Sequence, residues 1–198
     1  MHSLIVERKI NKWTLQEFDI AEYDGNKFFF YGRKWDVKDN KIGIYFPHFS
    51  FGNDFLGYSV RKVDETNGKW FHSYGFSKNN YLYGFIKTID YIREVRRVLV
   101  VEGLFDLLRL YQAGIKNVVS CFGITFTWNH FYLLYPFVDE IVFIPDGDEG
   151  GKKMVEKVKE FLSFVNIRVI NLPNGLDPDD YINKRGVSSF LKLIKGGK

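Results

Sequence analysis

The chain has 198 residues, of which 45% are hydrophobic and 18% aromatic, so it can build the core of one sizeable domain or of two small ones. It contains no apolar run of the roughly 18 residues that a membrane-spanning helix needs, and its first residues lack the apolar stretch of a secretory signal. The single cysteine, Cys121, excludes an intramolecular disulfide and a zinc site built from cysteines. We therefore expect a soluble, cytoplasmic protein with no membrane partner and no zinc.

The charge is unevenly distributed along the chain. Residues 1–97 carry 16 Lys and Arg against 12 Asp and Glu, whereas residues 98–198 carry 12 of each, and the net charge is +4. Half of the acids in the second part belong to the group described below, so the remainder of that part is basic. A basic body around an acidic crevice would attract a polyanion, although ordinary solvated lysines account for the same net charge.

Residues 1–84 predict a small, basic α+β subdomain. A short helical hairpin is expected around VERKI and TLQEFDI. Alternating, aromatic-rich segments then predict short strands, which are separated by turn-forming pieces such as YDGN and DETNG. The strands are expected at residues 27–32, 41–47, 56–63 and 69–74.

Residues 85–198 predict a second domain in which strands and helices alternate. The apolar run at 97–103 predicts a strand, and the spacing of leucines after it predicts a helix that stops at Gly114. A further helix is expected from about Thr127 to Tyr135. Strands are expected in NVVSCFG, EIVFIPDGD and IRVINLP, and helices in EGGKKMVEKVKEFLSFV and at the end of the chain. This alternation predicts an α/β fold with a mostly parallel sheet and helices on both faces.

Acidic residues follow the ends of three of these predicted strands. The carboxyl ends of parallel strands meet in one crevice, where clustered carboxylates repel one another unless a hard cation lies among them. Oxygen ligands of this type suit Mg²⁺ or Mn²⁺. The sequence therefore predicts metal-dependent phosphate chemistry. The residues lie in VEGLFD, PDGDEGG and GLDPDD and are Glu102, Asp106, Asp146, Asp148, Asp177 and Asp179.

Each acidic motif has a simpler interpretation when it is taken alone. DPDD before a helix is most often a helix cap, and DGD is a common turn. A carboxylate that ends a VLVV strand is less usual. The occurrence of all three motifs in this order, each at a strand end, favours a functional cluster.

Together these motifs resemble the Toprim module shared by bacterial-type primases, topoisomerases and some nucleases. The finer resemblance is to primases of the DnaG type, in which LYQAGIKNVVSCFG and LPNGLDPDD have similar counterparts. It extends upstream to cover nearly the whole chain, including a first half that a lone Toprim nuclease would lack. The upstream segments are ERKINKWTLQEFDI, IGIYFPHFSFGNDFLGYSVRKV and KWFHSYGFSKNNYLYGF.

The resemblance implies a role for each matching residue. Glu102 resembles the essential acid of the catalytic centre, a metal ligand and proton acceptor, and Asp146 with Asp148 resembles the paired metal ligands. The remaining three acids resemble supporting acids of the metal site. Basic positions that face the template or the incoming nucleotide are matched by Arg61, Lys69 and Lys78. Without the resemblance, these three would be interpreted as solvated charges on a sheet edge.

The chain departs from the family pattern at some positions. Gly123-Ile124 stands where Gly-Thr is usual, and Gly150-Gly151 stands where Ala-Gly is usual. KWFHS at residues 69–73 replaces Lys-Tyr-x-Asn-Ser. These departures remove no carboxylate, and they affect positions expected to contact nucleotide or template.

The resemblance implies a minimal DNA primase, a nucleotidyltransferase that makes short RNA primers on single-stranded DNA from ribonucleoside triphosphates by two-metal catalysis with Mg²⁺ or Mn²⁺. The N-terminal zinc module and the C-terminal helicase-binding domain of cellular primases are expected to be absent, and a replicative helicase is kept as a partner to test. Two alternatives stay open, a Toprim nuclease and a catalytically silent nucleic-acid-binding module. The segment KWFHSYGFSKNNYLYGF favours the primase over the nuclease, and the intact acidic set favours it over the silent module.

Several aromatic residues of the first half have the chemistry to stack on single-stranded bases. We expect most of them to lie in the core of the sheet instead. They are Phe28, Phe29, Phe30, Tyr45 and Phe49.

Overall fold

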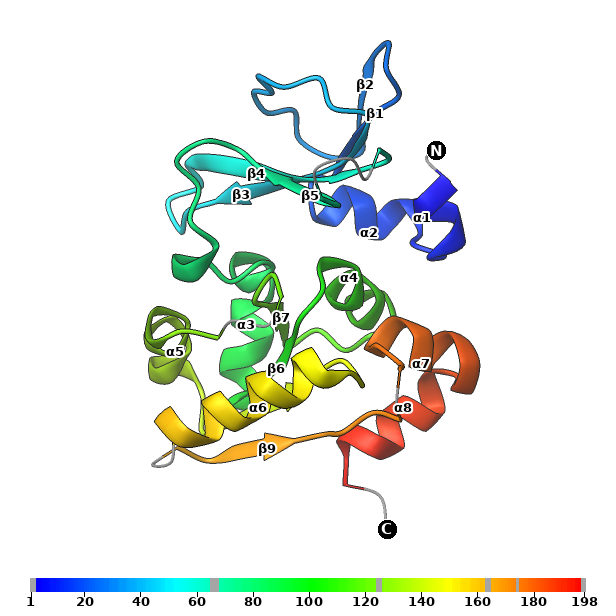
Figure 1. Ribbon diagram of the computed structural model, residues 1–198. Helices are drawn as coiled ribbons and strands as arrows, with labels where there is room; N and C mark the ends of the chain where they lie inside the picture. The colour runs from blue at the N-terminus through cyan, green and yellow to red at the C-terminus, as the bar shows by residue number, and fades with distance from the viewer. Residues whose placement is uncertain (1–2, 65–67, 124–125, 163–164, 174, 197–198) are drawn as a thin grey trace. The chain divides into compact units, whose positions relative to one another are not determined.

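The structure is a computed structural model that describes residues 3–64, 68–123, 126–162, 165–173 and 175–196. It divides into two compact units, Met1–Ser77 and Lys78–Lys198 (Figure 1). This division lies before residue 84, where the sequence pattern changes, because the intervening segment is bound to the second unit. Thr127 Oγ1 donates to Asn79 O over 2.7 Å, and Tyr83 forms an antiparallel bridge with Ser120.

The first unit is an antiparallel sheet with a helical hairpin at its start. Asn11 caps the second helix, because its Oδ1 accepts a 2.8 Å hydrogen bond from Thr14 N. Within the described residues, the five strands of the sheet are ordered β2-β1-β3-β4-β5. The elements are α1 (Ser3–Glu7), α2 (Lys12–Glu17), β1 (Ala21–Tyr23), β2 (Phe28–Phe30), β3 (Gly43–Phe49), β4 (Phe55–Lys62) and β5 (Trp70–His72). The hairpin and four of the strands were expected from the sequence, whereas the short strand β1 was not.

Aromatic rings form much of the core of the first unit. Tyr45 is fully buried and Phe49 is 8% exposed, as expected for core residues. Phe28 contacts Tyr45 edge-on with ring centroids 5.1 Å apart, whereas Phe29 points away and is 39% exposed. The indole of Trp35 lies against this cluster and donates to Asp19 O over 2.9 Å. These rings stabilise the sheet mainly because they are buried. Successive side chains of β2 point to opposite faces of the strand, so Phe28 lies against the core while Phe29 is exposed.

The second unit is the α/β domain that the sequence predicts. In its described part, four strands pair in parallel in the order β7-β6-β8-β9. The helix α3 was not anticipated and begins after Gly84, whose φ of +83° suits glycine. The strands are β6 (Arg97–Val101), β7 (Val118–Ser120), β8 (Glu140–Ile144) and β9 (Ile167–Val169). The helices are η1 (Lys78–Asn80), α3 (Phe85–Val95), α4 (Leu104–Gln112), α5 (Trp128–Leu134), η2 (Tyr135–Phe137), α6 (Glu149–Phe161), α7 (Pro178–Arg185) and α8 (Val187–Ile194).

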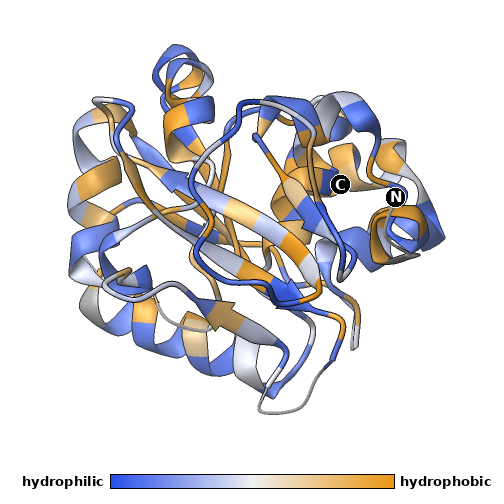
Figure 2. Ribbon diagram, turned by 90° about the horizontal axis from the view of Figure 1, so that it is seen from above, coloured by the Kyte–Doolittle hydropathy of each residue, from blue (hydrophilic) through white to orange (hydrophobic). Residues whose placement is uncertain are grey.

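The central strands β6 and β8 are buried at every position after the first, as expected when helices cover both faces of a parallel sheet. Val98 and Val100 pack with buried residues of α3, α5 and α6 in one hydrophobic core, which also contains Cys121. The helix α7 packs against both α4 and α8. Helices in Figure 2 alternate hydrophilic and hydrophobic residues, the pattern of elements with one buried side.

Candidate metal centre

The predicted acids gather at the carboxyl edge of the parallel sheet. Val101 of β6 and Ile144 of β8 are paired in register, so the residues that follow these two strands are neighbours. Glu102 follows β6 directly, and Asp146 comes two positions after the end of β8. The N–H of Asp146 donates to Glu102 Oε1 over 3.1 Å. The structure therefore brings the first two acidic motifs into direct contact.

Glu102 is held from several sides. Its carbonyl oxygen accepts hydrogen bonds from Ser120 Oγ at 2.8 Å and from Gly123 N at 3.0 Å, both in the segment at and after β7. The residue is only 5% exposed. Burial raises the pKa of the Glu102 carboxyl, the hydrogen bond from Asp146 opposes that rise, and the nearby charge of Asp148 adds to it.

Two glycines let the acidic loops approach closely. A Cβ on Gly151 would overlap Asp146 O and lie 3.0 Å from Glu102 Oε1, so only glycine lets α6 begin this close to the carboxylates. A Cβ on Gly147 would overlap Pro173 O. Gly147 N donates to Leu176 O over 2.9 Å, and Gly175 N donates to Gly147 O over 2.7 Å. The DGD loop is thus bonded through its main chain to the loop that precedes α7.

Asp106 lies in the first turn of α4 and is 4% exposed. Its Oδ1 accepts a hydrogen bond from Asp179 N over 3.1 Å, which joins α4 to the first turn of α7. Burial raises the pKa of Asp106 well above its ordinary value, and the negative charges of Asp177 and Asp146 raise it further. The third acidic motif is therefore close to the other two.

Asp148 and Asp177 are helix caps, a role that the simpler interpretation predicted for DPDD, whereas DGD taken alone predicted a turn. Asp148 Oδ1 accepts from Gly151 N over 2.9 Å at the start of α6, and Asp177 Oδ1 accepts from Asp180 N over 2.6 Å at the start of α7. A carboxylate has two oxygens, so capping by one leaves the other to act as an acceptor or a ligand. Capping and metal binding are compatible at both positions.

Asp179 differs from the other five acids in its surroundings. It is 2% exposed, and its Oδ1 lies 3.5 Å from Arg109 Nε. The same oxygen accepts from Asn183 Nδ2 over 3.0 Å, and Arg109 Nη2 donates to Asn183 Oδ1 over 3.0 Å. Arg109 and Asn183 were not predicted as site residues. The one feature of the sequence that indicates them is that each lies one helical turn from an acid of the cluster.

The donor chemistry of this edge suits a hard cation. Among the residues that the structure describes, no three His, Cys, Asp or Glu side chains are grouped closely enough to enclose an ion. Mg²⁺ in nucleotide enzymes is typically held by one or two carboxylates and completed by phosphates and water. The carboxylates of Glu102 and Asp146, which follow two neighbouring strands, fit that partly hydrated kind of site, and they do not fit a closed cage of protein ligands.

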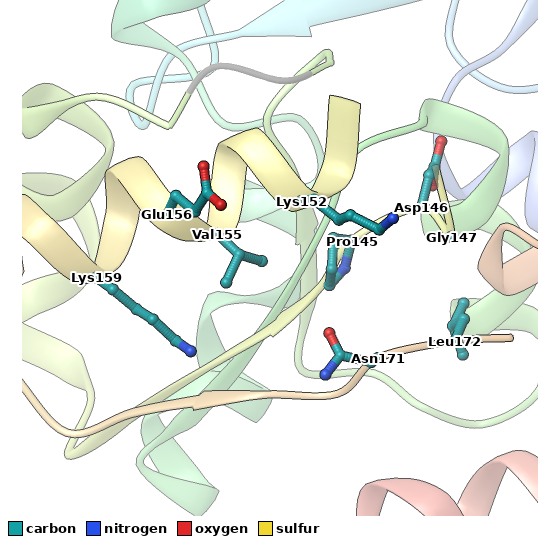
Figure 3. A pocket seen from close by; sticks show the side chains of 9 residues that line it. All are labelled: Pro145, Asp146, Gly147, Lys152, Val155, Glu156, Lys159, Asn171 and Leu172. Carbon is teal, nitrogen blue, oxygen red and sulfur yellow. The ribbon is translucent and has the colours of Figure 1, made fainter. Parts of the chain in front are cut away.

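A groove of about 330 Å³ lies beside Asp146, between α6 and the segment after β9. Figure 3 shows Lys152 and Lys159 extending from α6 along this groove, with Asn171 opposite and Glu156 turned away. Lys152 Nζ also pairs with Glu149 Oε1 at 2.6 Å. The two lysines were not predicted as site residues, although they lie two turns apart on one side of the helix.

The predicted basic residues lie in different units. Arg61 is on β4, where its Nη1 donates to Lys62 O over 3.1 Å, and Lys69 is exposed just before β5. Lys78 is exposed in η1 of the second unit, and its carbonyl oxygen lies 2.8 Å from His130 Nε2. The structure therefore brings Arg61 and Lys69 together, and Arg61 Nη1 donates to Lys69 O over 3.4 Å.

Residues in the segments that depart from the family pattern have structural partners of their own. His72 Nδ1 lies 2.7 Å from Ser59 Oγ, and Ser73 Oγ accepts from Tyr58 N over 2.9 Å, so both residues stabilise the first sheet. Gly123 donates to the carbonyl of Glu102, as described above. Ile124 lies outside the described residues.

Comparison with known proteins shows which family the second unit resembles. A family model described as Toprim-like matches residues 99–182. The chain is 35% identical to the DNA primase of Rickettsia typhi over 219 aligned residues, which cover 95% of this chain and 37% of that relative. Residues 99–182 match the Toprim-like family model, and the chain as a whole resembles the catalytic core of DNA primases. The resemblance stated from the motifs is confirmed.

Solved primase structures share the fold of this primase-like chain. The zinc-binding and RNA polymerase domains of the Aquifex aeolicus primase match with a TM-score of 0.83 at 25% identity, covering 98% of this chain and 55% of that one. A DnaG primase catalytic domain bound to ssDNA matches with a TM-score of 0.77 at 21% identity, covering 97% of this chain and 69% of that one. At this second identity the likeness concerns the fold. None of the helices in the described residues is long and apolar enough to span a membrane.

Proposed function

We propose that this chain is a primase core that joins ribonucleoside triphosphates into short RNA on a single-stranded DNA template, with Mg²⁺ or Mn²⁺ as cofactor. The observation that carries the proposal is the contact between Glu102 and Asp146 at the carboxyl edge of a Toprim-like sheet. The Rickettsia typhi relative is named a DNA primase, and a catalytic domain of the same fold is described as bound to ssDNA. Both names support nucleotide polymerisation on a DNA strand.

The chemistry assigned to the site is phosphoryl transfer. The oxygen of a primer 3′ hydroxyl attacks the α-phosphorus of the nucleotide, and the bond from that phosphorus to the bridging oxygen of pyrophosphate breaks. A bound divalent cation would act as a Lewis acid and neutralise charge on the phosphate oxygens. The carboxylates of Glu102, Asp146 and Asp148 are the groups proposed to hold it, with Asp106, Asp177 and Asp179 as supporting acids.

Glu102 is also proposed as the acceptor of the hydroxyl proton. Burial raises its pKa, and a carboxylate with a raised pKa is a stronger base than an ordinary one. The hydrogen bond from Asp146 N keeps one oxygen in place, which leaves the other to face the substrate. Positioning contributes alongside charge, because a fixed acceptor needs no reorganisation during the reaction.

A Toprim nuclease would use the same carboxylates, so the acids alone do not separate the two functions. The alignment with the Rickettsia typhi primase extends over 95% of the chain and therefore includes the first unit. That unit contributes an antiparallel sheet that carries the basic residues Arg61 and Lys69. This coverage favours the polymerase, with Arg61, Lys69 and Lys78 proposed to contact template or nucleotide.

The decisive experiment incubates the chain with labelled ribonucleotides, single-stranded DNA and Mg²⁺ or Mn²⁺, and separates the products on a gel. We expect short labelled RNA whose formation requires both template and nucleotides. The variant Asp146→Asn should lose this product, whereas Glu160→Gln, an exposed acid of α6, serves as a matched control. Shortening of end-labelled DNA without RNA synthesis would instead establish the nuclease.

Two further proposals follow from a role in DNA replication. The protein is proposed to act in the cytoplasm, and a replicative helicase is proposed as a partner. Co-purification of the chain with the helicase of its own host would check the second proposal. The control uses the same helicase with an unrelated bait in place of the chain. Failure to co-purify at micromolar concentration would remove the helicase from the list of partners.

A further inference from the structure

Arg109, Asp179 and Asn183 form a closed triangle between α4 and α7. Arg109 Nε lies 3.5 Å from Asp179 Oδ1, Asn183 Nδ2 donates to the same oxygen over 3.0 Å, and Arg109 Nη2 donates to Asn183 Oδ1 over 3.0 Å. The side chains of Arg109 and Asp179 are 14% and 2% exposed. Each of these three side chains therefore contacts the other two.

Asp179 is joined to α4 in a second way. Its backbone N–H donates to Asp106 Oδ1 over 3.1 Å. Asp106 and Arg109 are three positions apart on α4 and so lie on one side of that helix. The side chain and the backbone of one residue thus both fasten the first turn of α7 to α4. That turn begins at Asp177, the N-cap of α7.

The charge on Asp179 is balanced inside this triangle. A carboxylate as buried as this one is stable only when it is paired and hydrogen-bonded, and Arg109 with Asn183 supplies both. Asp146 is less buried than Asp179 and adjoins a groove. The two acids therefore have different surroundings although their motifs look alike in the sequence.

We infer that Arg109 is a positioning residue of the metal site: together with Asn183 it holds Asp179, and through that residue it fixes Asp106 and Asp177. Asp179 is a partner of Arg109 and not a ligand of the cation. The inference rests on the proposed metal-dependent function and narrows its ligand set from six acids to five. Groups that orient metal ligands in this way typically change metal affinity about 10- to 100-fold when they are removed.

The inference is tested by the Mn²⁺ affinity of the whole chain. Electron paramagnetic resonance of the free ion measures this affinity without nucleotide or DNA. Arg109→Met should weaken binding about 10- to 100-fold. Arg109→Lys should recover part of the loss, because an ammonium group keeps the charge beside Asp179 but lacks the planar fork that also reaches Asn183. Arg185→Met, on the exposed end of α7, is the matched control and should bind Mn²⁺ as the unaltered chain does.

The pair Asp179→Asn and Arg109→Met/Asp179→Asn separates positioning from ligation. Asp179→Asn alone leaves the buried guanidinium without its counter-charge and should weaken binding. The double variant leaves no unpaired charge in the triangle, so its affinity should return to within a few-fold of the unaltered chain. If Asp179 were a ligand, the double variant would bind at least as weakly as Asp179→Asn.

Each outcome is interpretable even if Arg109→Met unfolds, because the conservative and double variants keep the buried charges matched. Mn²⁺ affinity that is equal in Arg109→Met, Arg109→Lys and Arg185→Met would overturn the positioning role. A double variant that stays as weak as Asp179→Asn would overturn the exclusion of Asp179 from the ligand set. A chain that binds Mn²⁺ as expected but makes no RNA would contradict the proposed function and leave this inference standing.

Discussion

Asp146 N donates a hydrogen bond to Glu102 Oε1 over 3.1 Å, although the two residues are 44 positions apart in the chain. The contact follows from the in-register parallel pairing of β6 with β8, which brings the residues after the two strands to the same edge. It gives the glutamate a fixed orientation with one oxygen engaged.

Replacing Glu102 by Gln should reduce RNA synthesis by at least about 100-fold, because the change removes the charge and the basicity of the group but keeps its shape. The amide oxygen of Gln can still accept from Asp146 N, and burial disfavours the charged form of Glu102, so stability should not fall. Primer-extension rates test the expected loss of synthesis, and a thermal melt tests the expected stability. Extension at the unaltered rate would remove Glu102 from the catalytic centre.

Replacing Gly151 by Ala should destabilise the protein, although alanine normally favours a helix over glycine by about 1 kcal/mol. The added Cβ would overlap Asp146 O and press on Glu102 Oε1, so we expect a loss of about 1–3 kcal/mol in the free energy of unfolding, together with lower activity. Urea unfolding measures the change. Gly150→Ala is the matched control, since the family pattern carries alanine at that position; a stabilised Gly151→Ala would mean that α6 can shift without cost.

The stability of the protein should fall as the pH drops below about 6.5, the ordinary pKa of histidine. His48 is fully buried, and burial, followed by the charge of His72, lowers its pKa well below that value. As the pH falls, His48 therefore takes up a proton at a higher pH in the unfolded chain than in the folded chain. The contribution of His48 to stability is complete only above pH 6.5. Unfolding free energies measured from pH 8 to pH 5 should fall by up to about 1.4 kcal/mol per pH unit from this residue. The variant His48→Gln should show a shallower dependence, and identical curves would contradict the assignment.

DNA binding should depend strongly on salt, because basic side chains that contact phosphates release counterions from the strand. Replacing Arg61, Lys69 and Lys78 by Ala should flatten the slope of log K against log salt by up to about 2, at roughly 0.7 per phosphate contact on a single strand. Fluorescence anisotropy with labelled single-stranded DNA measures the slope. Alanine at the exposed Lys153, Lys157 and Lys184 removes the same charge and should leave the slope nearly unchanged. Equal slopes in both triple variants would move the template path elsewhere.

The parallel sheet and the acids at its edge could be predicted because they depend on local patterns. Apolar runs that end in Glu102 and Asp146 indicate strands, and a parallel sheet brings their ends together whatever the rest of the fold. The strand Ala21–Tyr23 and the helix Phe85–Val95 were not predicted. The strand has only three residues, too few for a clear alternation, and the helix follows a glycine with no side-chain cap.

The Arg109 triangle could not be predicted from the sequence. Its partners, Asp179 and Asn183, lie on a helix far along the chain, and only the packing of α4 against α7 makes them neighbours. The sequence likewise places Asp179 with Asp106 and Asp177 among the supporting acids of the metal site. The pairing with Arg109 separates Asp179 from Asp106 and Glu102, which are buried to a similar degree.

The only cysteine of the chain, Cys121, is buried in the core of the second unit, and burial together with the charge of Glu102 raises the pKa of its thiol to about 12. Thiolates, not thiols, react with maleimides, so this side chain stays inert at neutral pH. A cysteine introduced at any exposed position would then be the sole point of labelling. Two cysteines introduced in this way, one in each unit, would carry a pair of dyes that reports the separation of the units in solution.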